Sequence, residues 1–254
     1  MNDKTIKSNI TVLWNKAYEN YDECYAHGLK SEGEKKEWIR FLKSVVPKNC
    51  EKILDVGAGT GFVSLLLAEL GYNCKGLDLS ENMLSRAKVK AKKAGFSNVQ
   101  FVIGDAEDTK EEDNVYDVVI NRHLVWTLPH PEKAIAEWKR VLKPGGTLII
   151  MEGNWHYNRI SDRIQVFLGK CLISLQEHKN AFANSGDYDK LTKKELPMLN
   201  SKNAKRLAEI VREAGLSVTV IPMKNVDHAE KRAMPLRYKL LNPHKRIAVI
   251  GIKE

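Results

Sequence analysis

Apolar and polar residues follow two different rhythms along this chain. Short apolar runs predict strands at 53–56, 74–79, 99–103, 115–120 and 147–151. Between these runs apolar side chains recur every three or four residues, and this spacing predicts helices at 63–70, 80–95 and 131–142. A similar pattern before the first strand predicts a helix that Pro47 ends. Alternating strands and helices of these lengths favour a parallel sheet with helices on both faces.

Local signals mark several boundaries of these elements. Ser80 is a typical cap for the first turn of a helix, and Gly95 is a typical helix stop. Pro131 suits the first position of the next helix, because its missing N–H would be unpaired there anyway. The sequence Lys-Pro-Gly-Gly at 143–146 predicts a turn before the fifth strand.

The rhythm changes after Met151. Residues 160–175 and 204–211 carry helical patterns, and 216–221 and 247–252 are typical of two further strands. Residues 155–200 are therefore an insertion in the sheet domain, and we expect them to form a helical lid over the substrate site. Simple packing of these helices on one edge of the sheet is the alternative.

The chain of 254 residues is long enough for one large α/β domain. No run approaches the roughly 20 apolar residues that a membrane span needs, and residues 1–10 lack the apolar segment of a secretory signal. We therefore expect a soluble protein of the cytoplasm. The four cysteines form no CxxC pair, so we expect reduced thiols and no metal site.

The formal charge of +9 is unevenly distributed. Residues 222–254 contain eight Lys and Arg against three Asp and Glu, a surplus of five positive charges. Such a surplus suits nucleic acid, an anionic membrane or an acidic substrate. The lysines do not alternate with stacking aromatic residues, as a single-strand binder requires, so we favour a solvated basic surface.

The most informative segment is Ile-Leu-Asp-Val-Gly-Ala-Gly-Thr-Gly at 53–61, where a predicted strand runs into a glycine turn and then a helix. Glycine lets the backbone turn sharply and lets a ligand touch it. The spacing is GxGxG, and Phe62 stands where the dinucleotide fingerprint needs its third glycine. NAD and FAD are therefore disfavoured, and a phosphate loop is absent because no GK[ST] follows.

Two acidic residues narrow the choice of ligand. Asp55, before the turn, would repel a phosphate but suits a cationic amino group, directly or through water. Asp78, at the end of the second strand, is placed to accept hydrogen bonds from both hydroxyls of a ribose. A ligand with an adenosine, an amino-acid tail and no phosphate fits both residues. S-adenosylmethionine is such a ligand.

Five segments resemble, in the same order, the motifs of class I S-adenosylmethionine-dependent methyltransferases. They cover about residues 35–152 and are found at 53–61, 76–84, 104–107, 116–123 and 138–146. The last, Trp-Lys-Arg-Val-Leu-Lys-Pro-Gly-Gly, resembles the branch that includes quinone- and sterol-type enzymes. The resemblance implies S-adenosylmethionine as the cofactor, Asp105 as the acceptor for the adenine amino group, and a small-molecule substrate.

The resemblance also implies a fold and a set of cofactor contacts. The fold is α/β, a doubly wound, mostly parallel seven-stranded sheet with its last strand antiparallel. In similar enzymes an N-terminal segment folds over the cofactor, so we expect residues 1–30 to cover it and 31–254 to form the methyltransferase domain. The expected cofactor contacts are Tyr21, Asp55, Gly57, Ala58, Gly59, Thr60, Gly61, Asp78, Leu79, Met83, Asp105, Ala106, Glu107, Asn121 and Arg122.

Methyl transfer from a sulfonium mainly requires alignment of nucleophile, methyl and sulfur, with water excluded. His123, just past the fourth strand, is the candidate for a general base or acceptor-orienting group. Packing or a cofactor contact is the alternative role for this histidine. The candidate substrate contacts are Tyr18, His27, Trp126 and Trp155.

Three functions compete on the sequence. A small-molecule methyltransferase is favoured, because the insertion suits an enclosed site. An RNA methyltransferase would use the basic C-terminal stretch, but residues 121–124, Asn-Arg-His-Leu, lack the [DNS]PP[YFW] motif of enzymes that methylate base amines. A non-catalytic cofactor-binding protein is the third, and intact Asp55, Asp78 and Asp105 argue against it. Neither the acceptor nor the oligomeric state follows from the sequence.

Overall fold

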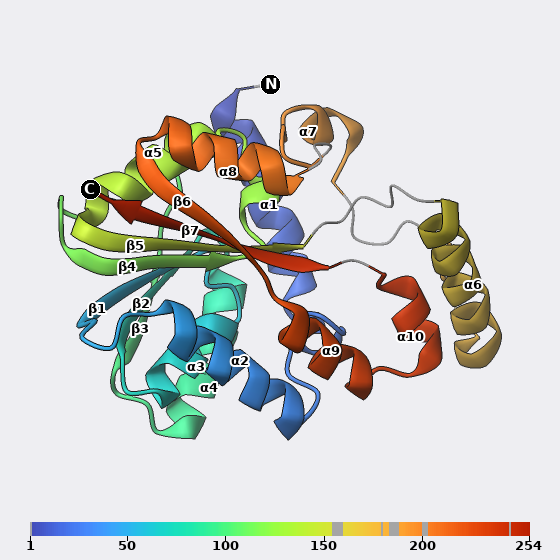
Figure 1. The fold of residues 1–254 in the computed structure, drawn as a ribbon. Helices are drawn as coiled ribbons and strands as arrows, with labels where there is room; N and C mark the ends of the chain where they lie inside the picture. The colour runs from blue at the N-terminus through green and yellow to red at the C-terminus, as the bar shows by residue number, and fades with distance from the viewer. Residues whose placement is uncertain (1, 154–159, 179, 183–187, 200–202, 244) are drawn as a thin grey trace.

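The computed structural model describes all residues except 1, 154–159, 179, 183–187, 200–202 and 244. Its described part contains a seven-stranded sheet with helices on both faces (Figure 1). The strands are β1 (Lys52–Val56), β2 (Asn73–Asp78), β3 (Val99–Ile103), β4 (Tyr116–Arg122), β5 (Leu142–Gly153), β6 (Leu216–Pro222) and β7 (Arg246–Lys253). Their order in the sheet is β3-β2-β1-β4-β5-β7-β6.

The strand order reverses at β1. This strand pairs in parallel with β2 on one side and with β4 on the other. In open α/β sheets, ligands bind beyond the carboxyl ends of the strands at such a reversal. β7 runs antiparallel to both of its neighbours, β5 and β6. The predicted mostly parallel sheet with an antiparallel last strand is therefore confirmed.

The helices divide between the two faces of the sheet. They are α1 (Asp3–Ala17), α2 (Glu32–Val45), α3 (Phe62–Glu69), α4 (Glu81–Ala94), α5 (Pro131–Val141), α6 (Ile160–Glu177), α7 (Lys190–Lys194), α8 (Asn203–Glu213), α9 (Lys224–Ala233) and α10 (Leu236–Leu241), with short 3-10 turns at Tyr21–Glu23 and Val125–Thr127. Figure 1 shows α5 and α8 on one face, and α2, α3, α4 and α9 on the other.

Strand side chains alternate between the two faces, and this alternation builds two cores. Leu54 and Val119 pack in one cluster with Trp138 of α5. Their neighbours Ile53 and Val118 point the other way and pack with α2, α3 and α9. All four strand residues are at most 1% exposed, so the central strands are buried on both sides, as parallel strands usually are.

The predicted boundary signals act as expected. The Ser80 hydroxyl accepts a hydrogen bond from the N–H of Met83 at 3.2 Å and caps α4. Gly95 ends this helix in the left-handed region, with φ of 72°. Pro131 is the first residue of α5.

The turn predicted at 143–146 lies inside β5 rather than before it. Tyr116 of β4 pairs with Leu142, but two residues later Val118 already pairs with Thr147. The four residues between Leu142 and Thr147 therefore stand opposite Asp117 alone and form a bulge. Pro144 has no N–H for the ladder and Gly145 has a φ of 75°, which explains why the chain bulges here.

Four α-helices of the described chain were not predicted from the sequence, namely α1, α7, α9 and α10. α1 begins at the Asn2 cap, whose side chain accepts from the N–H of Thr5 at 2.9 Å. α9 and α10 fill the stretch between β6 and β7. The buried side of α9 carries two acids beside Val226 and Ala229. Arg246, 2% exposed, forms ion pairs with these acids, Asp227 at 3.0 Å and Glu230 at 2.5 Å. Part of the basic C-terminal stretch is thus neutralised inside the protein.

The insertion at 155–200 divides into two parts. α6 packs against α10 at the outer edge of the molecule (Figure 1). Tyr188 and Leu196 instead pack in a cluster with Ile6 and Ile10 of α1. The lid role of the insertion stays a prediction. No helix in the described part of the chain is both long and apolar enough to cross a bilayer.

Candidate active site

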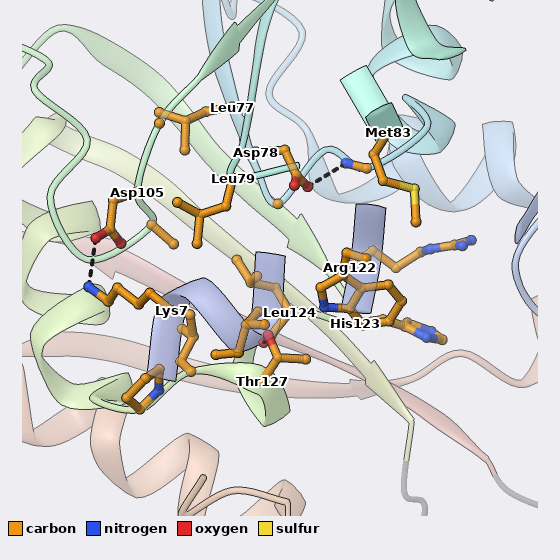
Figure 2. A pocket seen from close by; sticks show the side chains of 18 of the residues that line it. Lys7, Leu77, Asp78, Leu79, Met83, Asp105, Arg122, His123, Leu124 and Thr127 are labelled. Carbon is orange, nitrogen blue, oxygen red and sulfur yellow. Dashed lines mark hydrogen bonds and ion pairs between the residues drawn. The ribbon is translucent and has the colours of Figure 1, made fainter. Parts of the chain in front are cut away.

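A pocket lies where the strand order reverses, at the carboxyl ends of β1, β2 and β4 (Figure 2). α1 runs along this pocket and supplies part of its wall. The wall consists of Lys7, Ile10, Trp14, Tyr21, Gly57, Gly59, Leu77, Asp78, Leu79, Met83, Gly104, Asp105, Ala106, Arg122, His123, Leu124, Thr127, Leu128 and Pro129.

The structure brings about half of the predicted site residues into this wall. Those that line the pocket are Tyr21, Gly57, Gly59, Asp78, Leu79, Met83, Asp105, Ala106, Arg122 and His123. Those that the structure places outside the wall are Tyr18, His27, Asp55, Ala58, Thr60, Gly61, Glu107, Asn121 and Trp126. Trp155 lies outside the described residues.

The glycine loop after β1 fits a ligand closely. Gly57, Gly59 and Gly61 have φ values of 71°, 54° and 80°, which side chains disfavour. A Cβ on Gly57 would lie 2.7 Å from Leu124, so packing also requires glycine there. A Cβ on Gly59 would meet no protein atom within 4 Å and would instead project into open space. The loop is therefore a backbone surface that a ligand can approach.

Asp78 joins this loop to the next one. Its two carboxylate oxygens accept from the N–H groups of Gly59 and Ser80, both at 2.8 Å. Burial raises the pKa of Asp78, while these two N–H groups favour the charged form. A carboxylate has about four acceptor sites. Asp78 lines the pocket, and its remaining acceptor sites suit the two hydroxyls of a ribose.

Asp55 is hydrogen-bonded to Ser64 inside the protein. It is 1% exposed, and its carboxylate accepts from the backbone N–H and the hydroxyl of Ser64 at 3.0 and 2.5 Å. Burial raises the pKa of Asp55 to about 7. The carboxylate thus holds the first turn of α3. Its predicted contact with an amino group would have to run through water.

At the other end of the pocket, Asp105 forms an ion pair with Lys7 of α1. The Lys7 ammonium lies 2.6 Å from Asp105 and 2.7 Å from Glu107, whose side chain is fully buried. Glu107 also accepts from the N–H of His130 at 2.9 Å. Glu107 therefore positions Lys7 and the loop that follows the 3-10 turn at Val125–Thr127. An amino group that binds Asp105 shares this carboxylate with Lys7 or displaces it.

Arg122 places a buried positive charge beside the glycine loop. It is 9% exposed, donates to the carbonyl of His27 at 2.9 Å, and lies 3.7 Å above the ring of Phe62. Burial lowers the pKa of this guanidinium. No carboxylate among the described residues forms an ion pair with Arg122, and a guanidinium in this position suits an anionic group of a ligand.

His123 has an unusual backbone conformation. Its φ is 58°, in the left-handed region, and its N–H donates to the carbonyl of Met151 at 3.0 Å. Non-glycine residues in this region often mark functional sites. The ring of His27 lies 6.0 Å away, centroid to centroid. Burial and the charges of Arg122 and Arg246 lower the pKa of His27 to about 3, so His27 is neutral at physiological pH.

The remaining candidates lie outside the wall and differ in what they contact. Trp126 packs against Trp14, with ring centroids 6.2 Å apart. Thr60 donates to Asp22 at 2.6 Å and so fastens the N-terminal segment to the glycine loop. The Tyr18 hydroxyl donates to its neighbour Glu19 at 3.3 Å, in an exposed contact. Asn121 is fully buried, and neither atom of its amide is hydrogen-bonded to a described residue.

Sequence reasoning expected residues 1–30 to cover the cofactor, but it missed that Lys7, Ile10 and Trp14 of α1 line the pocket. The apolar residues Ile6, Ile10, Leu13 and Trp14 have helical spacing, and this signal was available. No local pattern in the sequence predicted a role for Lys7 in the pocket, because its partner Asp105 is 98 residues away. Among the described residues, no cluster of three or more His, Cys, Asp or Glu is arranged to hold a metal ion.

Comparison with known proteins agrees with this geometry. Residues 54–150 match the family described as "Methyltransferase domain". The demethylmenaquinone methyltransferase of Bacillus subtilis (strain 168) is 32% identical over 150 residues, which is 58% of this chain and 64% of that protein. The chain spans between 57% and 64% of the length of such relatives.

Solved structures share the fold at low identity. The phosphoethanolamine N-methyltransferase 2 of Haemonchus contortus, solved with phosphomonomethylethanolamine and S-adenosylhomocysteine, has a TM-score of 0.64 at 20% identity, over 94% of this chain and 57% of that one. The [4+2]-cyclase SpnF has a TM-score of 0.66 at 17% identity, over 97% and 96% of the two chains. The fold alone therefore does not specify the reaction.

The fold, the glycine loop and the family match agree with one another. Residues 54–150 are similar to methyltransferase domains, and the described strands form the mostly parallel seven-stranded sheet that we expected from the resemblance to class I S-adenosylmethionine-dependent methyltransferases. The relatives that this segment resembles include demethylmenaquinone methyltransferases, at 33% and 32% identity.

Glu152, at the end of β5, is a buried acid beside the site that the sequence did not reveal. It accepts from the N–H of Val125 at 2.8 Å, and burial raises its pKa from 4.5 to about 8. The folded protein therefore binds a proton that the unfolded chain releases between these two values. The stability that this difference contributes is present below pH 4.5 and is lost as the pH rises to about 8.

We predict that Glu152→Gln flattens the fall in the free energy of unfolding between about pH 5 and pH 8, because the amide keeps the Val125 hydrogen bond but does not titrate. Denaturant titrations at several pH values measure this slope. Glu51→Gln, at an exposed position, is the control and leaves the slope unchanged. Equal slopes in wild type and Glu152→Gln would contradict the prediction.

Proposed function

We propose that this chain binds S-adenosylmethionine in the pocket and transfers its methyl group to a small-molecule acceptor. The order of polar groups along the pocket carries the proposal. In Figure 2, Asp105 and Arg122 lie at opposite ends, with Asp78 between them. An adenine amine, a ribose and an amino-acid carboxylate follow one another in the same order in S-adenosylmethionine.

The adenosine half of the ligand has a matching surface. Asp78 offers carboxylate oxygens for the ribose hydroxyls, and Asp105 offers one for the adenine amine. Leu79, Met83 and Ala106 supply apolar contacts for the faces of the rings. Such a combination of apolar walls with a few fixed polar groups is typical of small-molecule sites.

The tail of the ligand has a matching charge. Arg122 beside the glycine loop suits a carboxylate. The negative charge of buried Asp55 favours the charged form of Arg122. The carboxylate of Asp78 accepts a hydrogen bond from the N–H of Gly59 in the loop. Its negative charge would repel a phosphate at this position. The same groups therefore argue for S-adenosylmethionine and against NAD.

The acceptor is expected beside His123, where Trp14 and Tyr21 also line the pocket. The rings of Trp14 and Tyr21 meet edge to face at 5.8 Å and help to exclude water. A relative is named demethylmenaquinone methyltransferase and a structural neighbour phosphoethanolamine N-methyltransferase. Demethylmenaquinone and phosphoethanolamine are therefore the first acceptors to test.

The residues of the chain have distinct tasks in this proposal. When bound, S-adenosylmethionine supplies a methyl group activated by a positively charged sulfur. Asp78 and Arg122 hold the two halves of the ligand, and the aromatic residues keep water out. His123 takes a proton from an acceptor that carries one at the attacking atom. Alignment alone suffices for an acceptor that is already ionised.

We expect isothermal titration calorimetry to detect binding of S-adenosylmethionine and S-adenosylhomocysteine, and no binding of NAD. Methyl transfer from labelled S-adenosylmethionine to the two acceptors above then tests catalysis. Heat from NAD without heat from either sulfur ligand would refute the cofactor assignment. Cofactor binding without transfer to any acceptor in a broad metabolite screen would favour a non-catalytic binding protein.

We predict that Asp78→Ala weakens S-adenosylhomocysteine binding more than Asp105→Ala. The Asp78 variant loses charge-assisted hydrogen bonds worth about 1.5–3 kcal/mol, or about 10- to 150-fold in the dissociation constant. The adenine amine in the Asp105 variant still finds backbone or water. Asp78→Asn, which keeps the shape of the side chain, guards against misfolding. Equal dissociation constants for the Asp78 and Asp105 variants would contradict this.

We predict that His123→Asn lowers turnover of a protonated acceptor by about 10²–10⁴-fold, the usual range for general-base catalysis, with little change in cofactor affinity. Asparagine tolerates the left-handed backbone of this position, so the fold is kept. Turnover is measured with the acceptor that the transfer assay identifies. A variant with normal turnover across the pH range would exclude His123 as the base.

A further inference from the structure

α6 presents a broad apolar surface to solvent, separate from the pocket. Five large side chains on one side of this helix are between 49% and 76% exposed, namely Ile160, Ile164, Phe167, Leu168 and Leu175. Their spacing keeps them within one face of a helix with 3.6 residues per turn. Phe182, 47% exposed, extends this surface, because its ring lies 5.8 Å from that of Phe167. We refer to these six residues as the α6 patch.

The opposite side of α6 is fixed to the protein. Gly169 and Ile173 are buried there. A Cβ on Gly169 would lie only 2.8 Å from the backbone of Leu241, so α6 and α10 are in close contact. Glu177 adds an ion pair with Arg237 at 2.7 Å. The orientation of α6 is thus determined by α10, and the patch points away from the protein, at the outer edge seen in Figure 1.

Basic residues lie beside the α6 patch on α6 itself and in the neighbouring α10 and the segment that follows it. Among the described residues of 160–182 and 234–245, five Lys and Arg stand against Asp162 and Glu177, a surplus of three positive charges in which Arg237 and Glu177 are paired with each other. Arg163 and Lys170 are on α6 itself, and the Lys170 ammonium lies 5.6 Å from the centre of the Phe182 ring. The patch therefore combines exposed apolar side chains with a positively charged border.

We propose that the α6 patch docks on the surface of an anionic lipid bilayer. An exposed apolar helix face with Lys and Arg at its border is the typical design of a helix that lies in the membrane interface. The apolar side chains enter the boundary between headgroups and acyl chains, and the basic side chains contact lipid phosphates. Contiguous apolar patches of this kind are rare on proteins that have no partner.

The charge of the patch argues against a second copy of this chain as the occupant. In a two-fold symmetric dimer the same surface faces itself, so the positive border of one patch would face that of the other. An anionic bilayer instead complements it. The inference is independent of the proposed methyl transfer, because it involves none of the pocket residues.

The test is co-sedimentation of the full chain with vesicles of phosphatidylcholine, with and without about one third phosphatidylglycerol. We expect binding to the anionic vesicles, weaker binding to the neutral ones, and a decrease with rising salt. Phe167→Asp lowers the partition coefficient by about tenfold or more, because it removes apolar contact and adds a negative charge.

Val89→Asp is the matched control, since Val89 on α4 and Phe167 are both 57% exposed and both variants change the net charge equally. It leaves vesicle binding nearly unchanged. Circular dichroism and S-adenosylhomocysteine binding confirm that both variants fold. Three outcomes would overturn the proposal. They are no binding to anionic vesicles, equal losses in the two variants, and a dimer in solution that Phe167→Asp dissociates.

Discussion

The carboxylate of Asp78 links the two loops on which the pocket depends. It accepts from the N–H of Gly59 in the glycine loop and from the N–H of Ser80 at the start of α4. Ser80 in turn caps α4 and donates to Asn15 of α1 at 2.6 Å. One partly buried charge thus sets the positions of the loop after β1, the first turn of α4 and the helix across the pocket. An apolar residue at this position would leave the N–H groups of Gly59 and Ser80 without this partner.

The N-terminal segment is the second part of this arrangement. α1 is tied to the adenine end through Lys7 and to residues 188–199 through an apolar cluster with Tyr188 and Leu196. The indole N–H of Trp14 also donates to the Tyr188 hydroxyl at 3.0 Å. Movement of α1 away from the pocket would therefore break contacts with the insertion as well. This coupling is the physical basis for proposing that both segments cover the ligand.

The sheet was predictable from the sequence because central parallel strands are buried on both faces and read as apolar runs. α9 was not, because Asp227 and Glu230 on its buried side owe their place to Arg246, which follows later in the chain. The same distinction holds in the site. Motif residues such as Gly59 and Asp78 are local in sequence and were found, whereas Lys7 reaches the pocket only through the tertiary fold. Local motifs identify the kind of ligand, and long-range contacts decide which motif residues touch it.

A crystal structure with S-adenosylhomocysteine tests the central claim most directly. We predict both ribose hydroxyls within hydrogen-bond distance of the Asp78 carboxylate, the adenine toward Asp105 and the amino-acid carboxylate toward Arg122. A ligand bound elsewhere, or bound in the reverse direction with its tail toward Asp105, would contradict the account.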